Sequence, residues 1–120
     1  MREILAVTKA LSDENRLRAL LAVKEGELCL CQIIQVLGLA PATVSKHMDT
    51  LERAGLVTRR REGKWRFYRL AATGGNPTAM RALAWVLEAL RKDPTIAADA
   101  RQIKDVRRRD LEELSACYRS

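Results

Sequence analysis

The stretch TVSKHMDTLERAGLVTRRREGKWRFYRL (residues 43–70) decides the fold of this 120-residue chain. Val44, Met48 and Leu51 follow one another at spacings of four and three residues, which predicts an amphipathic helix with one apolar face. Two β-prone runs then flank Glu62-Gly63-Lys64, which predicts a hairpin with a tight turn. A helix is therefore expected to run directly into a hairpin rich in arginine.

A second helix is predicted just before this stretch, from about Leu28 to Leu37. Residues 38–41, GLAP, read as a tight turn, and Pro41 suits the first turn of the following helix. Two helices joined by a short glycine-containing turn form the helix-turn-helix pattern, whose second helix enters the major groove of DNA. With the hairpin as its wing, the region predicts a mostly α-helical, winged helix-turn-helix fold with a two-stranded wing.

Further helices are predicted towards both ends of the chain. Ser12 or Asp13 is expected to cap one near the N-terminus. Asp93-Pro94 separates an apolar helical stripe over residues 80–90 from a charged final helix over about 95–117. These helices carry more apolar surface than a small winged domain buries, so we expect a homodimer formed through the N- and C-terminal helices. We divide the chain into a winged domain with its dimerisation helices (1–92) and a C-terminal helical extension (93–120).

The charge distribution predicts a polyanionic partner. The formal net charge is +7, and residues 59–69 hold six basic side chains against one acid. A second basic run, 107–109, lies among acids and is expected on a solvated or dimer-facing helix surface. No apolar run reaches the roughly 20 residues that span a bilayer, and no signal peptide is evident, so a cytoplasmic protein without a membrane partner is expected.

Two of the three cysteines, Cys29 and Cys31, lie one residue apart in GELCLCQII (26–34). Such a pair can be structural, redox-active or a binding site for a soft metal ion, because thiolates select thiophilic ions. Side chains two residues apart on an α-helix point about 200° away from each other. We therefore expect either that Cys29 precedes the helix or that a bound ion distorts the first turn.

These residues together resemble the arsenic-repressor (ArsR/SmtB) family of metal-sensing transcriptional repressors. The resemblance rests on GELCLCQI (26–33), on residues 43–70 and on the helix order, and covers about residues 3–92. It implies a dimeric repressor that releases operator DNA when an inducer binds. The cysteine pair is similar to that of the arsenite- and antimonite-responsive and the cadmium- and lead-responsive branches. Arsenite or antimonite is thus the expected inducer, with cadmium or lead as the alternative and no organic cofactor.

The chain also departs from the family pattern. A third cysteine often follows the pair by three residues, where this chain has Ile34, and an acidic residue often stands where it has Gln32. Arsenite prefers three thiolates, so Cys117, the only other cysteine, is either an incidental residue or the third ligand, from its own chain or its dimer partner. A site for metal on histidines of the last helix is excluded, because His47 is the only histidine.

The expected DNA contacts lie on the second helix and on the wing. They are Thr43, Ser45, Lys46, His47, Thr50 and Arg53 from the helix, and Arg60, Arg61, Lys64 and Arg66 from the wing. The basic ones are expected to contact phosphates, which position the protein without reading sequence. For His47, a structural hydrogen bond is the alternative.

Two other functions fit the same sequence. One is a repressor of this fold that responds to thiol oxidation or sulfide through Cys29 and Cys31. The other, from a different class, is a winged-helix protein-interaction module that binds no operator. An enzyme is not expected, because the chain has no Ser/His/acid set and no phosphate-binding glycine loop.

Overall fold

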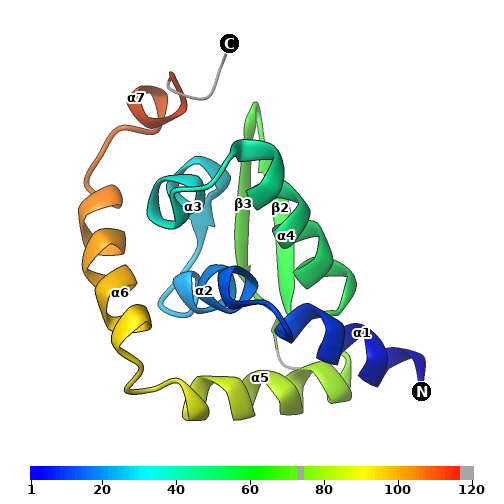
Figure 1. The fold of residues 1–120 in the computed structure, drawn as a ribbon. Coiled ribbons are helices and arrows are strands. Elements are labelled where there is room, and N and C mark those ends of the chain that lie inside the picture. Colours follow the sequence, from blue (N-terminus) through cyan, green and yellow to red (C-terminus); the bar gives the residue numbers. More distant parts are fainter. Residues whose placement is uncertain (73–74, 117–120) are drawn as a thin grey trace.

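The computed structural model describes residues 1–72 and 75–116. The helices are α1 (Arg2–Leu11), α2 (Glu14–Ala22), α3 (Leu30–Leu37), α4 (Pro41–Arg53), α5 (Pro77–Ala89), α6 (Pro94–Val106) and α7 (Leu111–Ala116), and the strands are β1 (Leu28–Cys29), β2 (Val57–Glu62) and β3 (Trp65–Leu70). Figure 1 shows α4 against one side of the hairpin, with α6 and α7 curving around the opposite side of the molecule. None of the helices in the described ranges is both long and apolar enough to cross a membrane.

The predicted helix-turn-helix is confirmed as α3 and α4. Gly38 ends α3 in the left-handed conformation (φ 68°), and Pro41 opens α4 at a position where its missing N–H costs no hydrogen bond. The side chains of Val44, Met48 and Leu51 are all fully buried, as their spacing predicted. The third helix begins at Leu30, two residues later than predicted.

The predicted wing is also confirmed, as β2 and β3, but it belongs to a three-stranded antiparallel sheet of order β1-β3-β2. The short strand β1 pairs with the other edge of β3, which sets Cys29 opposite Phe67. A two-residue strand gives no periodicity in the sequence, so only the tertiary pairing reveals it. Its consequence is that the residues before α3 are extended rather than helical.

The prediction of one final helix over about 95–117 is wrong. Asp93 caps α6 by accepting hydrogen bonds from the backbone N–H groups of Thr95 and Ile96, but α6 ends at Val106 and α7 begins at Leu111. The basic run 107–109 is therefore the turn between two helices rather than a helix surface. The turn is held because the Arg107 guanidinium donates to the backbone carbonyl oxygens of the chain near β1.

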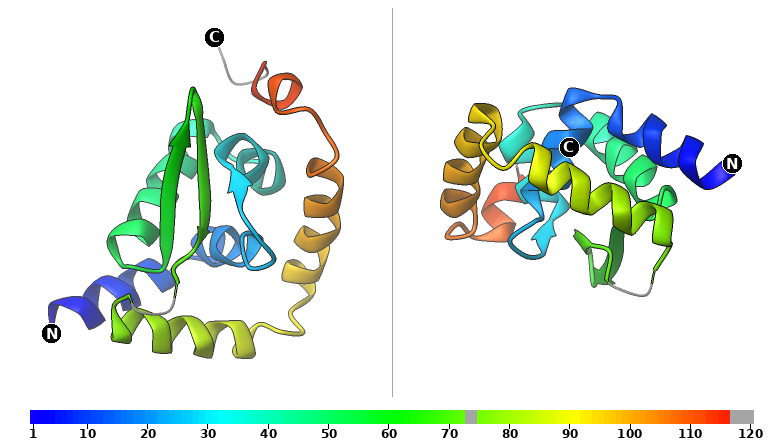
Figure 2. Two further views of the ribbon diagram at one scale, coloured as in Figure 1. Left: turned by 180° about the vertical axis from the view of Figure 1, so that it is seen from behind. Right: turned by 90° about the horizontal axis from the view of Figure 1, so that it is seen from below.

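The two ends of the chain pack differently. Helices α1 and α5 lie side by side at one end of the molecule (Figure 2), whereas α6 packs on α2 and α3 of the same chain. A hydrogen-bonded ion pair joins Arg18 of α2 to the buried Asp99 of α6 at 2.9 Å. Among the described residues, the large exposed apolar side chains are Met1, Ile4 and Leu5 on or beside α1, and Trp85 on α5. Within that part of the chain, exposed apolar surface thus gathers on α1 and α5.

Candidate metal site and nucleic-acid interface

Cys29 and Cys31 lie at the junction of β1 and α3. Cys29 is the N-cap residue of α3, with extended backbone angles (φ −72°, ψ 150°), and Cys31 lies in the first helical turn. This break between strand and helix turns both side chains to the same side. The Sγ atoms are 3.4 Å apart, and both residues are buried. Of the two arrangements expected from the sequence, the structure has the one in which Cys29 precedes the helix.

The surroundings of Cys29 favour its thiolate. The Cys31 thiol donates a hydrogen bond to the Cys29 sulfur and lowers the pKa of Cys29 to about 7, although burial opposes this shift. Backbone N–H groups of Cys31, Leu30 and Arg66 lower it further. The same hydrogen bond raises the pKa of Cys31, as does its burial. Of the two cysteines, Cys29 is therefore the one that loses its proton more readily.

The two cysteines open onto a small cavity of about 230 Å³. Its walls come from α3, from the first residue of α4, from the wing and from α7: Cys29, Leu30, Cys31, Ile34, Pro41, Lys64, Trp65, Arg66 and Ser115. The contributions of Pro41, Trp65 and Ser115 were not expected from the sequence, because they come from elements that only the fold brings together. The cavity thus joins the cysteines directly to the elements expected to bind DNA.

Gln32 organises the start of α3. Its side-chain oxygen accepts a hydrogen bond from the Cys29 backbone N–H at 2.7 Å, and its amide nitrogen lies 3.4 Å from the carbonyl oxygen of Val106 at the end of α6. A glutamine three residues after the N-cap is the spacing of a capping box, so the sequence does carry a signal for this role. Gln32 thus links the cysteine pair to α6.

A third metal ligand is not found among the described residues. Within 1–72 and 75–116, no group of three His, Cys, Asp or Glu side chains is arranged to hold a metal ion. The expected ligand Cys117 lies outside those residues. The described part of the site is therefore a pair of sulfurs.

Helix α4 carries the side chains that the sequence predicts to contact DNA. Thr43, Lys46 and Arg53 are exposed, while Ser45, His47 and Thr50 are partly buried. No side chain caps the helix, because its N-cap is Ala40.

Two of these α4 residues also make contacts within the protein. The Thr50 hydroxyl donates to the Lys46 carbonyl oxygen, and Nδ1 of His47 lies 3.3 Å from the Arg16 guanidinium. Since a guanidinium only donates, Nδ1 must accept this hydrogen bond. The ring is thereby oriented on α4, and the role of His47 towards DNA stays a prediction.

One face of the wing gathers positive charge. Strand alternation sets Arg59, Arg61 and Arg66 on the same face as the buried Tyr68, around a hollow of about 220 Å³. Arg59 lies near Asp49 and Glu52 of α4, at 4.0 and 3.7 Å. Arg61 and Arg66 stand directly opposite each other in the ladder, and neither makes an ion pair within 4.0 Å among the described residues. Like charges in this position repel each other unless an anion lies between them.

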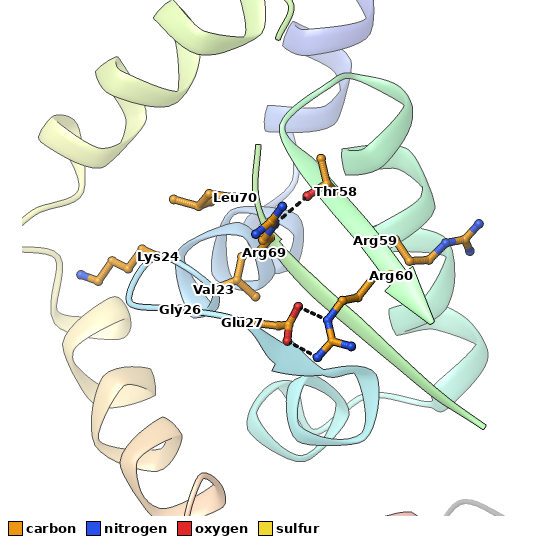
Figure 3. A pocket seen from close by; sticks show the side chains of 9 residues that line it. All are labelled: Val23, Lys24, Gly26, Glu27, Thr58, Arg59, Arg60, Arg69 and Leu70. Carbon is orange, nitrogen blue, oxygen red and sulfur yellow. Dashed lines mark hydrogen bonds and ion pairs between the residues drawn. The ribbon is translucent and has the colours of Figure 1, made fainter. Parts of the chain in front are cut away.

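Arg60 lies on the opposite face of the wing and is already engaged. Its guanidinium donates two hydrogen bonds to the Glu27 carboxylate, at 2.8 and 2.7 Å, across a hollow between β2 and the loop before β1 (Figure 3). It also stacks over the Phe67 ring at 4.4 Å. Arg60 would have to leave Glu27 to bind a phosphate with the same atoms.

Comparison with known proteins agrees with this architecture. A profile described as "Bacterial regulatory protein, arsR family" matches residues 13–59. The arsenic resistance transcriptional regulator ArsR2 of Pseudomonas putida is 36% identical over 100 residues, covering 82% of this chain and 78% of that protein. ArsR1 of the same organism, also an arsenic resistance transcriptional regulator, is 45% identical over 74 residues, but the match covers only 58% of each chain.

Solved structures show the same fold. The homodimeric winged helix-turn-helix DNA-binding domain Mb0332 from Mycobacterium bovis superposes with a TM-score of 0.62 at 29% identity, covering 78% of this chain and 82% of that one. This protein therefore belongs to the ArsR family of bacterial regulatory proteins, not to a class of enzymes.

Proposed function

We propose that the protein is a homodimeric transcriptional repressor that releases its operator when arsenite or antimonite binds the thiolates of Cys29 and Cys31. One observation carries the proposal: two sulfurs 3.4 Å apart face a cavity whose walls include the start of α4 and the tip of the wing. The similarity to arsenic resistance regulators supports the choice of ligand.

The chemistry of the pair suits a thiophilic ion. A metalloid binds thiolates rather than thiols, and a Cys29 pKa of about 7 makes the first thiolate available at neutral pH. Binding the second sulfur then displaces the Cys31 proton, which leaves as water together with a hydroxyl group of the metalloid. We further propose Cys117 as the third ligand, because Ser115, two residues earlier in the chain, lines the same cavity.

The cavity also supplies a route from ligand to DNA. An ion bound between the sulfurs would lie in the cavity lined by Pro41 of α4 and by Lys64 and Arg66 of the wing. Because Cys29 is already extended, no unwinding of α3 is required for both sulfurs to bind. The ligand needs only to prefer the arrangement of α4 and wing that binds DNA weakly, and DNA must then weaken ligand binding by the same factor.

On the DNA side, we propose that α4 reads the major groove and that Arg61, Lys64 and Arg66 contact phosphates. The repulsion between Arg61 and Arg66 favours this, because a phosphate between them would relieve it. Replacing Lys64 and Arg66 by alanine should flatten the salt dependence of operator affinity by about 0.9 in logarithmic slope for each lost phosphate contact. An unchanged salt dependence would mean that the wing does not contact the DNA phosphates.

We propose that two chains associate through α1 and α5. Leu5 and Trp85 are 59% and 67% exposed, which is unusual for large apolar side chains unless a partner covers them. The homodimeric state of Mb0332 supports this assembly. A two-fold dimer would place two α4 helices in major grooves about 34 Å apart, or a multiple of that distance.

The deciding experiment is titration of the operator complex with arsenite, antimonite, cadmium and lead. Wild-type protein should release DNA with one of the metalloids, and Cys29→Ser and Cys31→Ser should not. Cys117→Ser should bind arsenite more weakly if Cys117 is the third ligand. Unchanged arsenite affinity would mean that Cys117 is not a ligand. If no ion releases the wild-type protein, the proposed inducer is wrong.

The close sulfurs also favour a second candidate, a repressor that responds to oxidants or sulfide. The Cys29 thiolate can attack a peroxide and become a sulfenic acid, and the Cys31 thiol, 3.4 Å away, can then displace water from that sulfur to form a disulfide. Mass spectrometry after mild oxidant distinguishes the two functions. Loss of two hydrogens from residues 29–31, together with loss of operator binding, would favour the redox function.

A further inference from the structure

The segment from α6 to α7 (residues 94–116), here called the C-terminal arm, is attached to the chain next to the cysteine pair. Arg107 donates hydrogen bonds to the carbonyl oxygens of Gly26 at 3.2 Å and Glu27 at 3.0 Å, just before β1. The Gln32 amide, which also caps Cys29, reaches the last residue of α6. The middle of the arm is thus tied to both sides of the cysteine site.

The end of the arm reaches the wing. Helix α7 packs on α3, with Leu114 buried and Ser115 in the wall of the cysteine cavity. One turn earlier, the Glu112 carboxylate forms an ion pair with the Lys64 ammonium at 2.7 Å, at the tip of the wing. The same short helix therefore touches the cavity and a cation of the proposed DNA surface.

We propose that Glu112 competes with an operator phosphate for Lys64, so that α7 is an inhibitory contact controlled by the cysteine site. This inference rests on the proposed function, in which Lys64 binds DNA and the cysteines bind the inducer. A carboxylate and a phosphate offer the same anionic oxygens to an ammonium group, and Lys64 cannot stay paired with Glu112 while it moves to the DNA backbone.

The arrangement also sets the direction of control. A ligand that fills the cavity contacts the wall formed by α7 and holds that helix in the position where Glu112 reaches Lys64. With the cavity empty, α7 is held by its packing on α3 and by the exposed ion pair, whose two side chains are 48% and 60% accessible. Ligand binding therefore favours the state in which Lys64 is withheld from DNA.

The test is a double-mutant cycle on operator affinity in the full chain without inducer. Glu112→Gln should raise affinity about two- to fivefold, as expected for loss of an exposed ion pair. It should also steepen the salt dependence by about 0.9 in logarithmic slope per protomer if Lys64 gains a full phosphate contact. Glu113→Gln, the same change at the next exposed residue of α7, should do neither. In a Lys64→Gln background, Glu112→Gln should have no effect on affinity.

The inducer gives the second measurement. The fold loss of affinity caused by arsenite should be two- to fivefold smaller in Glu112→Gln than in wild type, and unchanged in Glu113→Gln. If Glu112→Gln changes operator affinity equally in the wild-type and the Lys64→Gln backgrounds, Glu112 does not compete with DNA for Lys64 and the proposal is wrong. If Lys64→Gln itself leaves affinity and salt slope unchanged, the wing contact of the proposed function fails instead.

Discussion

Replacing Cys31 by alanine should raise the pKa of Cys29, because the Cys31 thiol is the main group that lowers it. A hydrogen bond to a charged group contributes about 1.5–3 kcal/mol, and each pKa unit corresponds to about 1.4 kcal/mol. The Cys29 pKa should therefore rise from about 7 to between roughly 8 and 9. Cys31→Ser is the matched control, because its hydroxyl keeps a donor at the same position.

The measurement is the ultraviolet absorbance of the thiolate against pH, in a Cys117→Ser background that leaves only the pair of interest. The rate of alkylation against pH gives an independent value for the same group. A Cys29 pKa that stays near 7 in Cys31→Ala would refute the reasoning, since the backbone N–H groups at the start of α3 would then be sufficient. A large rise in Cys31→Ser would equally contradict a role for the donor.

The same shift makes stability depend on pH. The folded protein holds Cys29 deprotonated above about pH 7, whereas the unfolded chain keeps the proton up to its ordinary pKa of 9.0. The free energy of unfolding should therefore rise between pH 7 and 9, by up to about 3 kcal/mol, and this gain should be absent below pH 7. The raised pKa of Cys31 acts against stability only above about pH 9. In Cys31→Ala, urea unfolding curves measured at pH 7 and pH 9 should show little of this rise in the free energy of unfolding.

Three further variants test the fold and assembly. Arg18→Met should lower the free energy of unfolding by about 3 kcal/mol in a urea titration, because it leaves Asp99 buried without its partner. The control Arg91→Met breaks only an exposed ion pair and should cost under about 0.5 kcal/mol. Equal losses in the two variants would contradict the burial of the Arg18–Asp99 pair. Gly55→Ala should cost about 1–2 kcal/mol in thermal unfolding, because Gly55 holds φ +82°, and an unchanged melting temperature would mean that the turn relaxes. Leu5→Glu should yield monomers in sedimentation experiments, because it places a charge on the exposed apolar surface of α1, and a dimer of wild-type strength would place the interface elsewhere.

Much of the DNA-binding region could be predicted because its signals are local. The apolar face of α4 follows from helical periodicity, since residues three and four apart share a side. The position of Pro41 and the turn at Gly63 follow from backbone preferences of single residues. The nucleic-acid partner follows from charge, which depends on composition more than on folding.

The cysteine site could be predicted only in part, because its geometry depends on segments that are distant in the sequence. The spacing of Cys29 and Cys31 posed a geometric question that the sequence could not answer, because the answer depends on β1 pairing with a strand about forty residues away. The capping role of Gln32 did have a local signal. Its bond to Val106, and the contribution of Ser115 to the cavity, did not.

By itself, then, the sequence determined the helix-turn-helix and its wing, the basic surface and the presence of two neighbouring thiols. Tertiary structure alone decided that those thiols converge, that the final helix breaks at residues 107–110, and that Glu112 meets Lys64. The physical reason is the range of the interactions. Periodicity, caps and turns act within a few residues, whereas strand pairing and ion pairs between distant segments form only when the whole chain has closed around its core.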